Sequence, residues 1–97
     1  MAVQVILEFD AADGKADTVK AYFAEILPDT RRYSGFIQLD VLCDLDNPNS
    51  FAVYETWESR EAYQNYFNWR AETGVFTKLA EMIADKPKMR FFENTGI

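Results

Sequence analysis

The 97 residues suffice for one small domain with one hydrophobic core, and we expect residues 1–97 to form it. A hydrophobic share of 48% and a charged share of 27% exclude a disordered or low-complexity chain. The net charge of -6 makes nucleic acid and anionic membrane surfaces poor partners. No apolar run reaches the length of a bilayer span, and the start MAVQVILEFD lacks the basic region of an export signal, so we expect a cytoplasmic protein.

Two residue types limit the chemistry of the chain further. It contains no histidine and one cysteine, Cys43, which excludes Ser-His-Asp, Cys-His and zinc sites built from this chain alone. We therefore expect neither a metal nor another cofactor. We interpret Cys43 as a small buried side chain of a strand rather than a reactive thiol, and a lone cysteine is consistent with a reducing compartment.

The first third of the chain predicts a strand followed by a helix. Residues alternate between apolar and polar over Val3–Phe9, which is typical of a strand. Asp13 is a candidate N-cap for the helix that follows. The apolar stripe of that helix consists of Val19, Tyr22, Phe23, Ile26 and Leu27. Pro28 removes an amide donor, so we expect the helix to end near Leu27 or to continue for one turn through residues 31–32.

The middle of the chain predicts a β-hairpin. Gly35 opens its first strand, and residues 46–49, with the sequence Asp-Asn-Pro-Asn, supply the turn. One face of the first strand carries Ile37, Leu39, Val41 and Cys43, and one face of the second carries Phe51, Val53, Glu55 and Trp57. We therefore expect these two sets of side chains to lie on single faces of the sheet.

The last third predicts helical segments and a final strand. Ser59 is placed to cap a helix whose apolar face carries Tyr63, Tyr66 and Phe67, and Gly74 interrupts that helix. A second apolar stripe over residues 75–83 precedes Pro87, and the alternation at residues 89–93 predicts a strand.

The element order β-α-β-β-α-β predicts the α+β ferredoxin-like fold, also called the split βαβ arrangement. In this fold a four-stranded antiparallel sheet carries both helices on one face. The helix-free face has a mixed set of side chains: Ile6, Leu42, Tyr54 and Phe92 among Gln4, Glu8, Gln38, Asp40, Thr56 and Arg90. Because apolar patches of this kind often mark association surfaces, we expect a homodimer closed sheet against sheet.

Three segments carry a family resemblance: residues 35–42 (GFIQLDVL), the turn at 44–49 (DLDNPN) and residues 54–62 (YETWESREA). Together they resemble the antibiotic biosynthesis monooxygenase family, whose members are dimeric α/β barrels. The resemblance implies a cofactor-independent oxygenase that acts on phenols or quinols, although the family also includes haem-degrading enzymes and an isomerase.

The resemblance also implies roles for individual residues. Trp57 matches the tryptophan that ends the third strand in quinone-forming members, and Tyr63 matches a tyrosine early on the next helix. The chain departs from the family at two positions: Tyr66 stands where many members have histidine, and Val53 stands where some oxygenases have asparagine.

The residues themselves suggest how such an oxygenase would work. Glu55 lies between apolar neighbours, so burial could raise its pKa into the range useful for accepting a phenolic proton. Tyr63 and Tyr66 are candidate hydrogen-bond donors, and Trp57 offers a flat wall for an aromatic ring. We name these four as candidate catalytic residues. The candidate substrate-binding residues are Tyr22, Phe23, Val53 and Phe67.

Each assignment has an alternative. Glu55 could instead have a structural role, as an ion pair with Lys88 or Arg90 across the sheet. Packing alone could explain Trp57 and the aromatic stripe of the helix. The expected partners are a small-molecule substrate and molecular oxygen. The alternative functions are isomerisation of a small carbonyl compound and non-catalytic binding of a hydrophobic metabolite.

Overall fold

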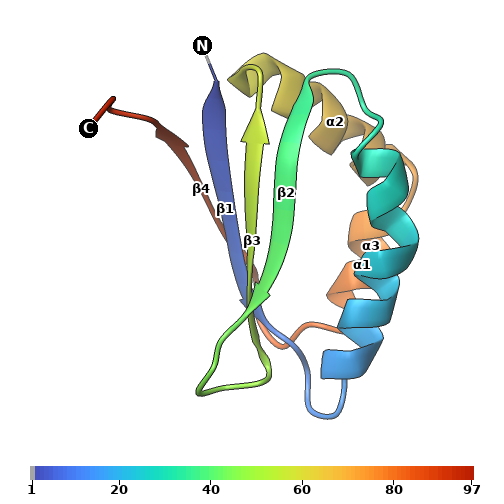
Figure 1. Cartoon of the computed structure of the whole chain (residues 1–97). Helices are drawn as coiled ribbons and strands as arrows, with labels where there is room; N and C mark the ends of the chain where they lie inside the picture. Colours follow the sequence, from blue (N-terminus) through green and yellow to red (C-terminus); the bar gives the residue numbers. More distant parts are fainter. Residues whose placement is uncertain (1) are drawn as a thin grey trace.

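The computed structural model describes residues 2–97 and contains the predicted elements, including the helical segment expected after Gly74. In chain order these are β1 (Val3–Asp10), α1 (Ala16–Thr30), β2 (Phe36–Cys43), β3 (Ser50–Trp57), α2 (Arg60–Glu72), α3 (Val75–Ala80) and β4 (Lys88–Glu93). The strands form one antiparallel sheet with the order β2-β3-β1-β4. All three helices lie on one face of this sheet (Figure 1). The predicted α+β ferredoxin-like fold is therefore confirmed.

The two central strands, β1 and β3, alternate between the helix-covered face and the open face. Along β3, every second residue from Phe51 to Trp57 is buried, and the residues between them are half-buried. Val5 pairs with Glu55 and Ile6 pairs with Tyr54, so the inward sides of the two strands meet in register. Side chains two apart on a strand point to the same face, which fixes the inward direction of both Glu55 and Trp57.

Helix α1 differs from the prediction at both ends. It begins at Ala16 with Lys15 at the N-cap position and no side-chain cap, so the predicted capping role of Asp13 is wrong. It continues through Pro28 to Thr30, as the alternative of one further turn allowed. Proline lacks only the bond to the carbonyl four residues earlier, and near the end of a helix that loss is tolerated more easily than in the middle.

Helix α2 begins as predicted, because the Ser59 side chain accepts a hydrogen bond from the Ala62 amide at 3.0 Å. Gly74 separates α2 from α3 with a positive φ of 84°. Gly35, at the start of β2, also has a positive φ of 88°, and a Cβ atom there would lie 2.5 Å from the Ala62 Cβ. Glycine at position 35 thus lets the loop before β2 pack directly on α2.

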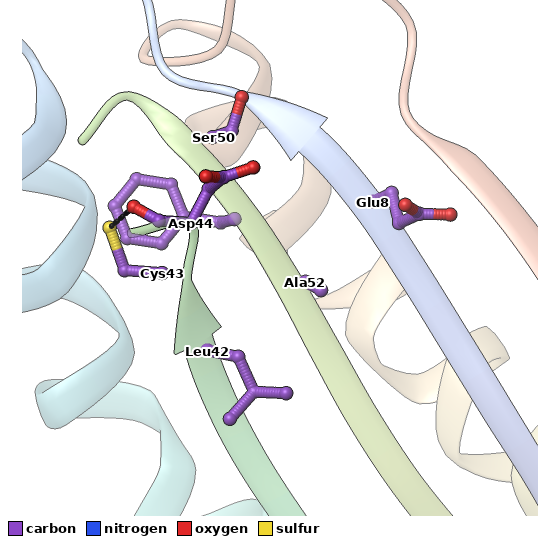
Figure 2. Close-up of a pocket in the computed structure, with 7 residues that line it drawn as sticks. Glu8, Leu42, Cys43, Asp44, Ser50 and Ala52 are labelled. Atoms are coloured by element: carbon purple, nitrogen blue, oxygen red, sulfur yellow. Dashed lines mark hydrogen bonds between the residues drawn. The ribbon is translucent and has the colours of Figure 1, made fainter. Parts of the chain in front are cut away.

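A β-bulge in β2 overturns part of the predicted hairpin. The register against β3 shifts between Phe36 and Gln38, so Ile37 is 50% exposed instead of sharing the inward face with Leu39. Cys43 is also exposed, contrary to the expectation of a buried side chain. It lies at the end of the edge strand β2, where no further strand covers it (Figure 2). Its thiol donates to the Pro48 carbonyl at 3.5 Å.

The helix-covered face contains two clusters of buried side chains. The larger cluster lies under α1 and α3 and includes Phe9, Phe23, Phe51 and Val53. The smaller cluster lies under α2 and consists of Val3, Val5, Trp57, Tyr63 and Tyr66, with further aromatic side chains packed against it. None of the helices within residues 2–97 combines the length and the apolar character needed to cross a bilayer.

Candidate functional site

The carboxyl group of Glu55 lies at the boundary between the two clusters. Glu55 pairs with Val5 of β1 on one side and with Leu39 of β2 on the other, and only 4% of its surface is exposed. Its Oε1 atom accepts a hydrogen bond of 3.0 Å from the indole Nε1 of Trp57. This contact follows from the strand itself, because residues two apart on β3 point to the same face.

Glu55 makes no ion pair within residues 2–97, so the predicted pairing with Lys88 or Arg90 is wrong. The reason is the register: Val5, the neighbour of Glu55, pairs with Phe91, and Lys88 and Arg90 alternate onto the opposite face. Burial without a cationic partner raises the pKa of Glu55 to about 7, against the smaller opposing effect of the bond from Trp57. At neutral pH the carboxyl group is therefore divided between its acid and its base forms.

Trp57 is the centre of an aromatic cluster. It is fully buried, and its ring centroid lies 4.8 Å from that of Tyr66 and 5.6 Å from that of Tyr63. Phe36 and Tyr33 contact it edge-on at 5.4 and 6.4 Å. Close aromatic pairs of this kind stabilise a fold by about 0.5–1.5 kcal/mol each beyond the area they bury. The structure thus brings together the four residues proposed as catalytic.

The two tyrosines of α2 use their hydroxyl groups differently. Tyr63 donates to the Met89 sulfur at 3.2 Å, and burial raises its pKa, with further contributions from Glu55 and Tyr66. Tyr66 lies 2.7 Å from the Thr30 hydroxyl. Tyr63 is therefore committed to a weak acceptor on β4, whereas Tyr66 belongs to a polar network.

The four predicted substrate-binding residues are divided between the clusters. Phe67 is half-buried beside Tyr63, with ring centroids 6.2 Å apart, and so borders the candidate catalytic residues. The other three belong to the larger cluster under α1 and α3. Among them, Tyr22 donates a long hydrogen bond of 3.4 Å to the Val75 carbonyl.

Aromatic rings pack beside Glu55, and a surface hollow lies on the outer side of Tyr33. Tyr33 is half-buried in the loop between α1 and β2, and its ring lies 5.4 Å from Tyr66 and 5.1 Å from Trp69. The hollow outside it has a volume of about 410 Å³ and is also lined by Gly35 and Asn65. A ligand reaches Trp57 from this side only when the Tyr33 ring moves.

A second hollow, of about 190 Å³, lies at the far end of the sheet (Figure 2). It is lined by Glu8, Leu42, Cys43, Asp44, Ser50, Phe51 and Ala52. None of the candidate catalytic residues belongs to it. Within residues 2–97, no group of three or more cysteine, aspartate or glutamate side chains is arranged to hold a metal ion.

Sequence reasoning missed two members of the site, Thr30 and Arg70. Both are buried, with 0% and 4% of their surfaces exposed, and both bond to Tyr66. A signal for Arg70 was present, because it follows Tyr66 by four residues and so lies on the same side of α2. No comparable signal exists for Thr30, since it reaches Tyr66 from the end of α1, 36 residues away.

Comparisons with known structures support this fold. A conserved protein from Methanosarcina mazei Go1 superposes with a TM-score of 0.89 at 16% identity, covering 98% of this chain and 94% of that one. SnoaB from Streptomyces nogalater, a cofactor-independent oxygenase crystallised as a mutant, gives a TM-score of 0.85 at 18% identity, covering 97% and 93%. Protein SO0527 from Shewanella oneidensis gives 0.83 at 21% identity, covering 94% and 88%. At these identities the similarity establishes the fold alone.

Comparison of the sequence with curated proteins finds no match. The family model described as antibiotic biosynthesis monooxygenase, in contrast, matches residues 2–71. The matched segment runs from β1 to the last turn of α2 and includes Glu55, Trp57, Tyr63 and Tyr66. The chain therefore belongs to the antibiotic biosynthesis monooxygenase family.

Proposed function

We propose that this protein is a cofactor-independent monooxygenase that acts on a small hydroxylated aromatic or quinol substrate. The observation that carries the proposal is the Glu55 carboxyl group, which is buried beside aromatic rings, has no ion-pair partner within residues 2–97 and has its pKa raised to about 7. A general base is most effective when its pKa lies near the working pH. Family membership and the structural similarity to SnoaB support the same reaction class.

The proposed reaction needs a base and an aromatic wall from the protein. The Glu55 carboxylate accepts the phenolic proton, and the resulting electron-rich anion supplies the electrons that reduce molecular oxygen. One oxygen atom enters the ring as the quinone carbonyl. The other oxygen atom leaves in a water molecule, whose two hydrogens are the phenolic hydrogen and the hydrogen of the oxidised carbon. Trp57 stacks against the flat substrate, and Tyr66 donates a hydrogen bond to its oxygen.

Substrate binding requires a rearrangement of the aromatic cluster. The side chains of Trp57, Tyr63 and Tyr66 pack directly on one another. Displacement of Tyr33 from the half-buried loop before β2 would connect the hollow of about 410 Å³ with this cluster. Phe67 contacts Tyr63 and would border the substrate, whereas Tyr22, Phe23 and Val53 would line its far end under α1.

We further propose that two copies pair through their helix-free faces, as expected from the sequence. β3, in the middle of this face, contributes Tyr54, and β1 contributes its neighbour Ile6. The edges carry opposite charges: Asp40 lies on β2, and Lys88 and Arg90 lie on β4. A two-fold axis that lies between the two sheets, parallel to their strands, would place the acidic edge of one copy near the basic edge of the other.

Oxygen uptake tests the proposed reaction. The purified protein is freed of metal and flavin and supplied with a panel of anthrone-type and hydroquinone-type substrates. We expect uptake by the wild type, a loss of about 10²-fold in kcat for Glu55→Gln, and a larger loss for the double variant Trp57→Phe, Tyr63→Phe. Glu81→Gln, which changes an exposed carboxylate just beyond α3, is the matched control and should retain activity.

The oxygenase proposal would be overturned if the wild type consumed oxygen no faster than the double variant with any substrate of the panel. Isomerisation is the second candidate, because a carboxyl group with a pKa of about 7 can also return the proton it accepts. In that case deuterium from the solvent would enter a carbonyl substrate even in the absence of molecular oxygen. A ligand that co-purifies and is never converted would instead indicate a binding protein.

A further inference from the structure

Arg70 is a buried cation without a carboxylate partner among residues 2–97. It lies in the last turn of α2, with 4% of its surface exposed, and all its hydrogen bonds go to neutral oxygens. Its Nη2 atom donates to the Ile26 carbonyl and to Thr30 Oγ1, both at 2.7 Å, and its Nε atom donates to Tyr66 Oη at 3.0 Å. The guanidinium also lies over the Trp69 ring at 4.4 Å, which offsets part of the cost of burying its charge. Because no carboxylate within residues 2–97 neutralises that charge, it remains available to an anion.

Arg70 constrains the hydrogen bond between Thr30 and Tyr66. A guanidinium group only donates, so Thr30 Oγ1 and Tyr66 Oη both accept from Arg70. Either hydroxyl group can donate across their 2.7 Å contact. When Thr30 donates, the Tyr66 oxygen accepts twice, and its own proton is free for a ligand.

The environment of Tyr66 keeps that proton in place until a ligand arrives. Burial raises the pKa of Tyr66, whereas its bonds with Thr30 and Arg70 and the charge of Arg70 act in the opposite direction. Tyr66 is therefore a neutral phenol at neutral pH, with an oxygen that accepts a hydrogen bond from Arg70. Its ring lies against Trp57 at 4.8 Å, and the negative charge of Glu55 also raises the pKa of Tyr66.

We propose that Arg70, together with Thr30, is the positioning residue that holds Tyr66 as the hydrogen-bond donor to the phenolate oxygen of the substrate. The proposal rests on the proposed function, because it concerns the same site and substrate class. When Glu55 accepts the phenolic proton, the carboxyl group becomes neutral and the substrate becomes an anion. Arg70 then supplies the positive charge that balances this anion, acting through the Tyr66 hydroxyl.

Binding of 4-nitrophenol tests this proposal without turnover, because its phenol and phenolate forms absorb at different visible wavelengths. The measurement is the pH at which the bound probe ionises. We expect this pH to be about one unit higher in Arg70→Gln and in Tyr66→Phe than in the wild type. Arg60→Gln is the matched control, since Arg60 also lies on α2 but stacks on Phe91 at 4.3 Å, and it should leave the value unchanged.

The double variant Tyr66→Phe, Arg70→Gln separates positioning from a general structural effect. If Arg70 acts through Tyr66, the double variant should shift the ionisation no further than either single variant. Thr30→Val keeps the side-chain shape without its hydroxyl group and should also raise the pH at which the bound probe ionises. This variant replaces Arg70→Gln in the test if Arg70→Gln fails to fold. Additive shifts, or no shift in Thr30→Val and Arg70→Gln, would overturn the proposal.

Two further outcomes keep this proposal distinct from the proposed function. Failure of the wild type to bind 4-nitrophenol at millimolar concentration would overturn the role of Arg70. A shifted ionisation in a wild type that consumes no oxygen with any substrate would support that role and refute the oxygenase reaction alone.

Discussion

Glu55 combines an acidic side chain with a position from which water is almost excluded. The sequence predicted that it would face inward with Trp57, because strand alternation is a local property. It did not predict the absence of an ion pair, because that depends on which face of β4 carries Lys88 and Arg90. A carboxyl group buried in this way destabilises the fold when it ionises, and this cost makes stability depend on pH.

Ionisation of Glu55 should lower the stability of the protein as the pH rises. Its pKa is about 7 in the folded chain and 4.5 as the reference for the unfolded chain, so between these values the folded state binds more protons. Stability is therefore fully present below pH 4.5 and is lost as the pH passes through 7, by about 3 kcal/mol for this group. Urea unfolding between pH 5 and pH 8 measures the effect.

Glu55→Gln serves as the reference for this measurement, because glutamine has nearly the same shape and does not ionise. The unfolding free energy of the wild type, relative to that of this variant, should fall as the pH rises from 5 to 8. Glu58→Gln, at an exposed position, should follow the wild type. A difference that stays constant from pH 5 to pH 8 would show that Glu55 ionises with an ordinary pKa.

The elements were more predictable than the contacts between them. Alternation located β1, β3 and β4, and Ser59 marked the start of α2, because each of these signals is confined to a few neighbouring residues. The bulge at Ile37 was not predictable, since the inserted residue is recognised only by its pairing with β3. The hydrogen bonds from Arg70 to the end of α1 were not predictable either, because they depend on how two helices pack against each other.

The loop between α1 and β2 separates the aromatic cluster from solvent. Its side chain Tyr33 contacts Trp57, Tyr66 and Trp69, and its hydroxyl donates only a long hydrogen bond of 3.4 Å to the Asn65 carbonyl. The ring is therefore held mainly by packing. This arrangement makes Tyr33 the side chain whose removal should open the cluster toward the hollow outside it.

Removal of the Tyr33 ring should expose Trp57 to small solutes. The chain has two tryptophans, so Trp69→Phe leaves Trp57 as the single tryptophan fluorophore. In that background we expect Tyr33→Ala to raise the acrylamide quenching constant of Trp57 several-fold, because Trp57 has 0% of its surface exposed in the intact chain. Tyr33→Phe is the control and should change quenching little. Equal quenching in all three proteins would show that Trp57 is shielded by other side chains.

At the scale of the whole molecule, the sheet is covered on one side only (Figure 1). Its open face carries apolar side chains across several strands, among them Leu42, with 51% of its surface exposed, and Phe92, with 38%. Leu42, Ala52 and Glu8 lie side by side on neighbouring strands of this face (Figure 2). A surface of this composition is better suited to a second copy of the chain than to water, and this supports the proposed dimer.

Tyr54→Lys should therefore convert the dimer into a monomer of 11.2 kDa. Tyr54 lies on the central strand β3, where a lysine buried between the two sheets would lose its hydration. We expect the dissociation constant from sedimentation equilibrium to rise at least about tenfold, equivalent to about 1.4 kcal/mol. Leu45→Lys, at a fully exposed position in the β2–β3 turn, makes a similar change outside this face and should leave the dimer intact. A wild-type monomer at all concentrations, or equal weakening by both substitutions, would place association elsewhere or exclude it.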